Sequence, residues 1–255
     1  MNTEKTLEVI FTPAEFAALS QRDLGQTVCV VFDILRATTS MMTALANGAT
    51  AILPVGDIPG AIALRNQRPD VLLAGERDGV RILGHLTGGV DFDLGNSPRE
   101  FTPDKVKDRL IVMTTTNGTR ALRACAKANS ILIGSFLNLR TISNWIEREN
   151  PQNLLIVCSG THEEASYEDL LAAGALADMV WPGYAAGHIA DSAEIARQIF
   201  RVMQKDLLSA MQYARNGRRL LANPELRDDV RACVQRETLT FVAAMDKEGV
   251  VRKLD

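Results

Sequence analysis

Three stretches of the chain share one pattern of hydrophobic and polar positions. Each begins with a run of mainly β-branched apolar residues, passes through a polar loop and continues with apolar residues at helical spacing; the first two end in another apolar run. They are VCVVFDILRATTSMMTALANGATAILPV (28 to 55), LIVMTTTNGTRALRACAKANSILIGS (110 to 135) and LLIVCSGTHEEASYEDLLAAGALADMV (154 to 180). Continuous apolar strands followed by helices are typical of βαβ units. We therefore predict an α/β fold with three layers, α/β/α, around a largely parallel or mixed sheet.

The rest of the chain predicts less regular structure. Residues 75 to 97, GERDGVRILGHLTGGVDFDLGNS, hold six glycines and indicate a long irregular connection with a short strand at Val80 to Leu83. Long loops in compact domains commonly serve a site. Residues 191 to 222 show helical spacing, and a further helix is expected from Asn223-Pro224 to about Val234. We expect one domain over residues 1 to 255, with a C-terminal helical part from about residue 190.

Composition narrows the function. A net charge of -3 and a pI near 5.7 argue against a general nucleic-acid surface, which needs clustered Lys and Arg. The N-terminus lacks a signal-peptide pattern, and no apolar stretch reaches about 18 residues, so we expect a cytoplasmic protein without a membrane span. The four cysteines form no CxxC pair and the three histidines are scattered, so a zinc or histidine metal site is not expected. Small-molecule or protein partners fit best, and a homodimer is left open.

Polar residues follow each of the three predicted strands. Loops at the carboxyl ends of parallel strands lie along one edge of a sheet, so these loops should meet. Hydroxyl groups, guanidinium groups and helix N-termini at one edge favour an anion, and carboxylates beside them suit Mg²⁺, which needs few protein ligands. The residues concerned are Asp33, Arg36, Thr38 and Thr39 in the first loop, Thr114 to Arg120 in the second, and Ser159 to Thr161 with Glu168 and Asp169 in the third.

Each candidate could also have a purely structural role. Asn117-Gly118 could form a two-residue hairpin turn, but the following RALRACAKA has helical spacing and good helix formers, which disfavours a second strand. The structural roles open to the remaining candidates are a cap or turn for Asp33, surface charges for Arg36 and Arg120, an ion pair of Glu76 with Arg77, and helix caps for Ser97, Glu168 and Asp169. The residues alone thus indicate a phosphate-like anion site with acids suited to Mg²⁺, and they do not give the reaction.

Five motifs, in order over roughly residues 28 to 178, carry a family resemblance. They are FDILRATTSMMTALANGA, LLAGER, FDLGNSP, TTTNGTRAL and EDLLAAGAL. With these motifs the chain resembles the 2-phosphosulfolactate phosphatase family of coenzyme M biosynthesis. The resemblance implies an α/β fold and Mg²⁺-dependent hydrolysis of a small acidic phosphoester, 2-phosphosulfolactate, to sulfolactate and phosphate. Residues 83 to 90, LGHLTGGV, lengthen the link between GER and GNSP, and residues after 180 match no motif of the family.

Residue pattern and resemblance together give a candidate site. We expect Asp33, Glu76 and Asp169 to be catalytic and to bind Mg²⁺, with Arg36 as a further catalytic residue. The expected substrate-binding residues are Arg36, Thr38, Thr39, Arg77, Asn96, Ser97, Thr115, Thr116, Asn117, Gly118, Thr119, Arg120 and Glu168. Metal-assisted attack of water is the preferred route, and a covalent aspartyl route through Asp33 stays open. The alternatives are a phosphatase for another phospho-acid and a non-catalytic protein that binds an anionic metabolite.

Overall fold

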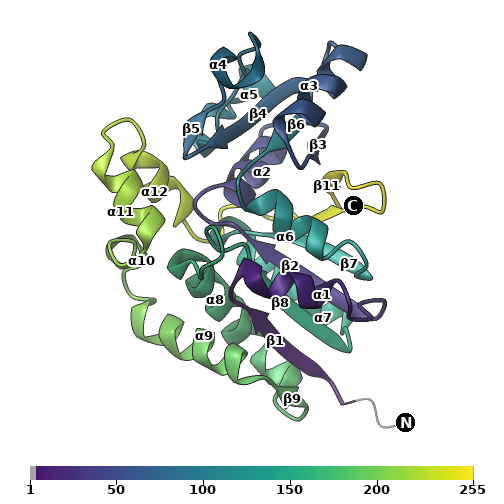
Figure 1. Ribbon diagram of the computed structural model, residues 1–255. Coiled ribbons are helices and arrows are strands. Elements are labelled where there is room, and N and C mark those ends of the chain that lie inside the picture. Colours follow the sequence, from purple (N-terminus) through teal and green to yellow (C-terminus); the bar gives the residue numbers. More distant parts are fainter. Residues whose placement is uncertain (1–3, 255) are drawn as a thin grey trace.

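A computed structural model describes residues 4 to 254 (Figure 1). Its strands form an eleven-stranded sheet in the order β5-β4-β6-β3-β11-β10-β7-β2-β8-β1-β9. The strands are β1 (Thr6–Ile10), β2 (Thr27–Phe32), β3 (Ala51–Pro54), β4 (Leu72–Arg77), β5 (Val80–Arg81), β6 (Leu110–Thr114), β7 (Ser130–Gly134), β8 (Asn153–Cys158), β9 (His188–Ile189), β10 (Ala243–Met245) and β11 (Val251–Lys253).

The sheet consists of two groups of parallel strands joined by a hairpin. Strands β7, β2, β8 and β1 form one parallel group, and β3, β6 and β4 form the other. The hairpin β10–β11 lies between them and pairs antiparallel with β7 on one side and with β3 on the other. Three antiparallel contacts separate β7 from β3, so the two groups run in opposite directions.

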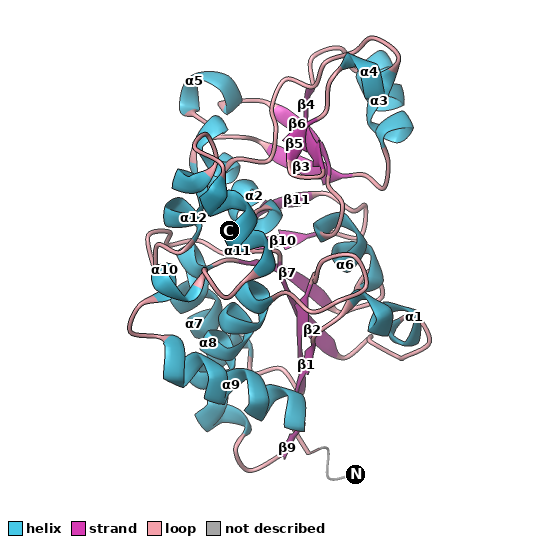
Figure 2. Cartoon of the chain, turned by 60° about the vertical axis from the view of Figure 1, so that its left-hand side comes forward, coloured by secondary structure: helices cyan, strands magenta, loops and turns pink. Residues whose placement is uncertain are grey.

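Helices cover both faces of the sheet. They are α1 (Phe16–Leu19), α2 (Ala37–Ala46), α3 (Ile58–Gln67), α4 (Gly84–Thr87), α5 (Pro103–Val106), α6 (Gly118–Ala124), α7 (Leu139–Glu149), α8 (Tyr167–Tyr184), α9 (Asp191–Met203), α10 (Leu207–Ala210), α11 (Arg215–Ala222) and α12 (Arg227–Cys233), with 3-10 turns at Pro13–Glu15, Pro98–Glu100 and Phe136–Asn138. In Figure 2, α7, α8 and α9 lie on one side of the first strand group, and α1 and α6 lie on the other.

Strand β2 shows why both faces are apolar. Val30 and Phe32 point into the core that contains α7, α8 and α9. The intervening Cys29 and Val31 point into a second core with α1, α2 and α6. Because successive side chains of a strand point to opposite faces, β2 contacts both helical layers. Burial of both faces requires an unbroken run of apolar residues. The second core also contains Ile52 and Ile111 of the other strand group, so it joins the two groups.

The predicted α/β class, with three layers and a mixed sheet, is confirmed. The prediction that the first two stretches form βαβ units is wrong, because α2 connects β2 to β3 and α6 connects β6 to β7, each crossing from one strand group to the other. Apolar runs indicate that a segment is a strand, but they do not specify its partner.

The two less regular regions hold more structure than the pattern predicted. The residues GER, expected in an irregular connection, end strand β4, and the short strand that was expected at residues 80 to 83 is β5. The helical spacing of residues 191 to 222 corresponds to α9, α10 and α11, and the helix expected after Pro224 is α12. The hairpin β10–β11 was not predicted. No helix within residues 4 to 254 is long and apolar enough to cross a membrane.

Candidate active site

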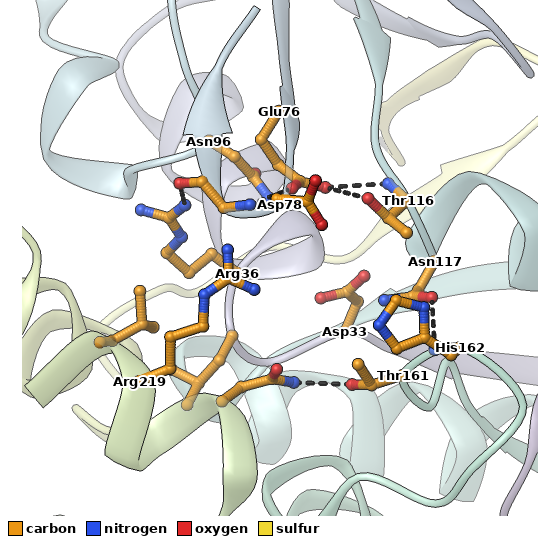
Figure 3. Close-up of a pocket in the computed structure, with 14 residues that line it drawn as sticks. Asp33, Arg36, Glu76, Asp78, Asn96, Thr116, Asn117, Thr161, His162 and Arg219 are labelled. Carbon is orange, nitrogen blue, oxygen red and sulfur yellow. Dashed lines mark hydrogen bonds between the residues drawn. The ribbon is translucent and has the colours of Figure 1, made fainter.

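A pocket opens where loops from both strand groups meet helix α11 (Figure 3). The loops after β2 and β8 reach it from one group, and those after β4 and β6 reach it from the other. Its lining residues are Asp33, Leu35, Arg36, Glu76, Asp78, Gly79, Asn96, Thr116, Asn117, Thr161, His162, Asn216, Arg219 and Leu220. Loops at the carboxyl ends of strands thus meet at one pocket, as predicted, although they come from two opposed strand groups and not from one parallel edge.

Asp33 directly follows β2 and is buried. The Ala37 N–H donates to Asp33 Oδ1 at 3.1 Å, and the Thr38 N–H and hydroxyl both donate to the Asp33 carbonyl oxygen at 3.0 Å. These bonds fix the carboxylate at the start of α2. Burial raises the pKa of Asp33 to about 6, the Ala37 hydrogen bond opposes the rise, and the charge of Glu76 adds to it.

Glu76 joins the loops that follow β4 and β6. Its Oε1 accepts hydrogen bonds from the Thr116 N–H and the Thr116 hydroxyl, both at 2.9 Å, and its Oε2 accepts one from the Gly79 N–H at 2.7 Å. Its side chain is buried and lines the pocket. Because these donors come from two loops, Glu76 fastens the two loops to each other. It also presents its charge to the pocket.

Asn117-Gly118 begins helix α6 and is not a hairpin turn. A Cβ placed on Gly118 would lie 2.7 Å from Asp33 Oδ2 and 2.9 Å from Ala37 Cβ, so only glycine allows the two crossover segments to approach this closely. Asn117 Oδ1 accepts a hydrogen bond from the His162 N–H at 3.2 Å. Asn117 therefore joins the β6 loop to the β8 loop, and it also lines the pocket.

Arg36 is held by a buried ion pair. Its Nη1 donates to Asp229 Oδ2 of α12 at 2.7 Å, with side-chain exposures of 4% and 0%, and its Nη2 donates to the Gly79 carbonyl oxygen at 2.7 Å. The Ser97 hydroxyl donates to Asp229 Oδ1 at 2.6 Å. Ser97 thus supports the partner of Arg36 and does not line the pocket.

Asp169 and Glu168 lie behind the pocket wall, in the first turn of α8. Asp169 accepts hydrogen bonds from the Ile34 N–H at 2.8 Å, the Ser159 hydroxyl at 3.0 Å and the Gly160 N–H at 3.1 Å, so it fastens the β2 loop to the β8 loop. Burial, with the charges of Glu168 and Asp33, raises its pKa well above the ordinary range. Asp169 therefore holds the two loops in position. We expected it to bind Mg²⁺, but its side chain does not line the pocket.

Glu168 is a buried acid with one oxygen engaged. Its Oε1 accepts a hydrogen bond from Asn216 Nδ2 at 2.6 Å, and its Oε2 is buried with no hydrogen-bond partner among the residues that the structure describes. Burial raises the pKa of Glu168 to about 7, and the charge of Asp33 contributes in the same direction. Glu168 thus supports α11 through Asn216 and, like Asp169, does not line the pocket.

The structure brings together only some of the expected residues. Asp33, Arg36, Glu76, Asn96, Thr116 and Asn117 line the pocket. The others face elsewhere: Thr38 bonds to Asp33, Thr39 to the Ile34 carbonyl oxygen, Thr119 to the Thr115 carbonyl oxygen, Arg77 to Glu76 and Thr114, and Arg120 to the exposed Glu163. Thr115 is buried and Gly118 serves the close approach to Asp33. Many residues follow a strand end, so this position alone could not distinguish the residues that line the pocket from those that do not.

Several lining residues had no usable signal in the sequence. Asn216 and Arg219 come from α11 and the supporting Asp229 comes from α12, a region without a recognised motif. Thr161 and His162 do follow β8, as the convergence of loops predicted, but scattered histidines gave no reason to single out His162. Asp78 directly follows the GER residues, so the LLAGER motif could have indicated that it lies near the site.

A buried carboxylate beside arginines at the carboxyl ends of α/β strands is typical of enzymes that act on small anions. The model of the 2-phosphosulpholactate phosphatase family matches residues 14–248. The chain therefore belongs to this family of phosphoric monoester hydrolases, and the resemblance seen in its motifs is confirmed.

Similar proteins extend over nearly the whole chain. A protein of Caldanaerobacter subterraneus subsp. tengcongensis is 35% identical over 241 residues, covering 93% of this chain and 95% of its own. One from Symbiobacterium thermophilum is 36% identical, with 90% and 95% covered, and one from Pseudothermotoga lettingae is 33% identical, with 97% and 99% covered. All three are named probable 2-phosphosulfolactate phosphatase. The similarity thus includes α11 and α12, beyond the motifs.

Replacing Asp229 tests the buried ion pair. Asp229→Ala leaves the Arg36 charge buried and unpaired, so we expect the free energy of unfolding to fall by about 3–5 kcal/mol in urea denaturation. Asp228→Ala is the matched control, because this neighbour is 62% exposed, and it should change stability by less than about 1 kcal/mol. Equal losses in the two variants would contradict the assignment. Adding Arg36→Met to Asp229→Ala should recover part of the loss.

Replacing Glu168 tests its raised pKa. Between the ordinary carboxyl pKa and about 7, the unfolded chain releases this proton while the folded chain retains it, so wild-type stability should fall as pH rises through that interval. Glu168→Gln cannot ionise. Relative to wild type, its free energy of unfolding should therefore rise by about 2 kcal/mol between about pH 5 and pH 8. Glu225→Gln, at an exposed position, should follow the wild-type pH curve. Parallel curves for wild type and Glu168→Gln would exclude the shift.

Proposed function

We propose that this protein is a Mg²⁺-dependent phosphatase that hydrolyses 2-phosphosulfolactate to sulfolactate and inorganic phosphate. Its membership of the family and the names of its relatives support the substrate. The proposal carries with it a cytoplasmic location and a place in coenzyme M biosynthesis, both taken from the sequence expectations.

The observation that carries the metal dependence is the charge balance of the pocket. Its lining contains three carboxylates, those of Asp33, Glu76 and Asp78, but only two arginines among the described residues. One of these, Arg36, is already paired with Asp229. A phosphoester of an organic acid brings further negative charge, which an acid-rich pocket disfavours unless a cation accompanies it. A divalent cation restores the balance.

The donor groups in the pocket fit Mg²⁺. The structure has no cluster of three or more His, Cys, Asp or Glu that could hold a metal within residues 4 to 254. Mg²⁺ does not need one, because it binds through one or two carboxylates and keeps several waters. Asn96 Oδ1 is buried without a hydrogen-bond partner in that same range, as expected of an oxygen that binds a ligand. We therefore assign Asp33, Glu76 and the amide oxygen of Asn96 to the metal, and we leave Asp169 as a residue that positions Asp33.

The reaction joins a water oxygen to phosphorus, breaks the ester P–O bond and returns a proton to the leaving alkoxide. When bound by Asp33, Glu76 and Asn96, Mg²⁺ would supply positive charge for the phosphoryl group and would make water a better nucleophile. Two N–H groups of Arg36 are used for Asp229 and Gly79, and a guanidinium has about five, so donors are left for the phosphoryl group. Asp229 and Ser97 keep Arg36 in place during the reaction. We favour attack by water over an aspartyl phosphate because Asp33 belongs to the metal set.

Phosphate release tests the function. Purified protein is assayed with 2-phosphosulfolactate, phospholactate, phosphoglycolate and phenyl phosphate, with Mg²⁺ or with EDTA. We expect the highest kcat/KM for 2-phosphosulfolactate, loss of activity in EDTA and recovery when excess Mg²⁺ is added. A higher kcat/KM for another phospho-acid would move the assignment to that substrate. Tight binding without release of phosphate would make the protein an anionic-metabolite binder.

Asp33→Asn tests the central carboxylate. The amide retains an oxygen that can accept the Ala37 hydrogen bond but loses the charge, so we expect kcat to fall at least about 100-fold. The far-UV circular dichroism spectrum should be unchanged. Asp70→Asn, at a side chain that is 74% exposed, should keep wild-type kcat. Full activity of Asp33→Asn would remove Asp33 from the mechanism.

A further inference from the structure

Helix α11 is fastened to the pocket by hydrogen bonds of the half-buried Asn216 side chain. Asn216 Nδ2 donates to Thr161 Oγ1 at 2.7 Å and to Glu168 Oε1 at 2.6 Å. At Gly217, a Cβ would lie 2.0 Å from the Met211 carbonyl oxygen, so the helix packs directly on the preceding turn. The position of α11 beside the β8 loop is therefore well defined, although its sequence carries no family motif.

Arg219 lies one helical turn after Asn216 and projects from the same face of α11. Figure 3 shows its side chain extending from the helix into the pocket. Its guanidinium lies over the backbone of Gly79, since a Cβ on Gly79 would be 2.8 Å from Arg219 Nη2. Because Gly79 has no side chain, the Arg219 guanidinium fits against the pocket wall without a steric clash.

Arg219 has no partner within the part of the chain that the structure describes. The ion pairs and side-chain hydrogen bonds of residues 4 to 254 do not include its guanidinium. Arg36, the other arginine of the lining, is engaged by Asp229 and Gly79. Arg77 and Arg120, which we expected to bind substrate, do not line the pocket. Of the two arginines in the described lining, Arg219 is therefore the one whose charge has no ion-pair partner.

We propose that Arg219 binds the anionic group of the substrate that is not transferred, a carboxylate or sulfonate on the carbon skeleton. This deepens the proposed function and rests on it. The planar guanidinium presents a fork of donors that matches an oxyacid. Arg219 enters from α11, whereas Asp33 enters from the loop after β2 and Glu76 from the end of β4, so the phosphoryl end and the acid end contact different walls. The enzyme thereby selects phosphoesters that carry their own acid group.

The selectivity ratio tests this assignment. For wild type and Arg219→Gln, kcat/KM is measured with 2-phosphosulfolactate and with phenyl phosphate, which has no second acid group. We expect the ratio of the two values to fall about 10- to 100-fold in Arg219→Gln, mainly through KM for the acid substrate, and to be partly restored in Arg219→Lys. Arg227→Gln removes the same charge from an exposed position at the start of α12 and should keep the wild-type ratio. An unchanged ratio in Arg219→Gln would overturn the proposal.

Product binding separates this proposal from the catalytic one. Calorimetry with sulfolactate, and competition by lactate and by isethionate, need no turnover. We expect Arg219→Gln to weaken sulfolactate binding at least about 10-fold. Weaker competition by lactate would assign the guanidinium to the carboxylate, and weaker competition by isethionate would assign it to the sulfonate. Unchanged binding of all three would exclude Arg219 as the acid-binding residue, even if the wild-type protein released no phosphate and the proposed function failed.

Discussion

The close approach of two crossover segments is the constraint on which the site depends. The segment from β2 into α2 carries Asp33, and the segment from β6 into α6 carries Gly118. A methyl group on Gly118 would collide with Asp33 Oδ2 and Ala37. Each segment leads from one strand group to the other, so their meeting point is a contact between two connections that both link the halves of the sheet. The same contact thus serves the architecture and brings the Asp33 carboxylate next to the loops of the opposite group.

Several acidic side chains are buried close together at the site. Asp33, Glu168 and Asp169 are all withdrawn from water, and the charge of Asp33 raises the pKa of both Glu168 and Asp169. The protein compensates with directed donors, including the Ile34, Ala37 and Gly160 N–H groups. Burial of acids destabilises the folded state, and such a cost is typical of residues retained for chemistry. A cation at the pocket would offset part of it.

The sequence predicted the elements of this fold better than their arrangement. The strands β2, β6 and β8 and the helices after them follow from local apolar periodicity, which a single segment contains. Pairing depends on residues far away, and the hairpin β10–β11 that separates the two groups has strands of only three residues. The site shows the same division. Asp33 was predicted from its place after a strand, and Glu76 from the LLAGER motif, whereas Asp229 meets Arg36 across a separation of 193 residues, a contact with no local signature.

The position of the hairpin in the sheet has a consequence for how the molecule forms. During synthesis the strands of the two parallel groups and the helices between them emerge first, but the two groups share no direct strand contact within the described sheet. Residues 243 to 253 supply that contact, and the helices with Asn216, Arg219 and Asp229 precede them only shortly. Contacts of such long sequence separation form late and slowly. A ribosome-bound chain thus exposes the edges of β7 and β3 until β10 and β11 have been synthesised, and only then are the two strand groups that carry the pocket loops held in one sheet.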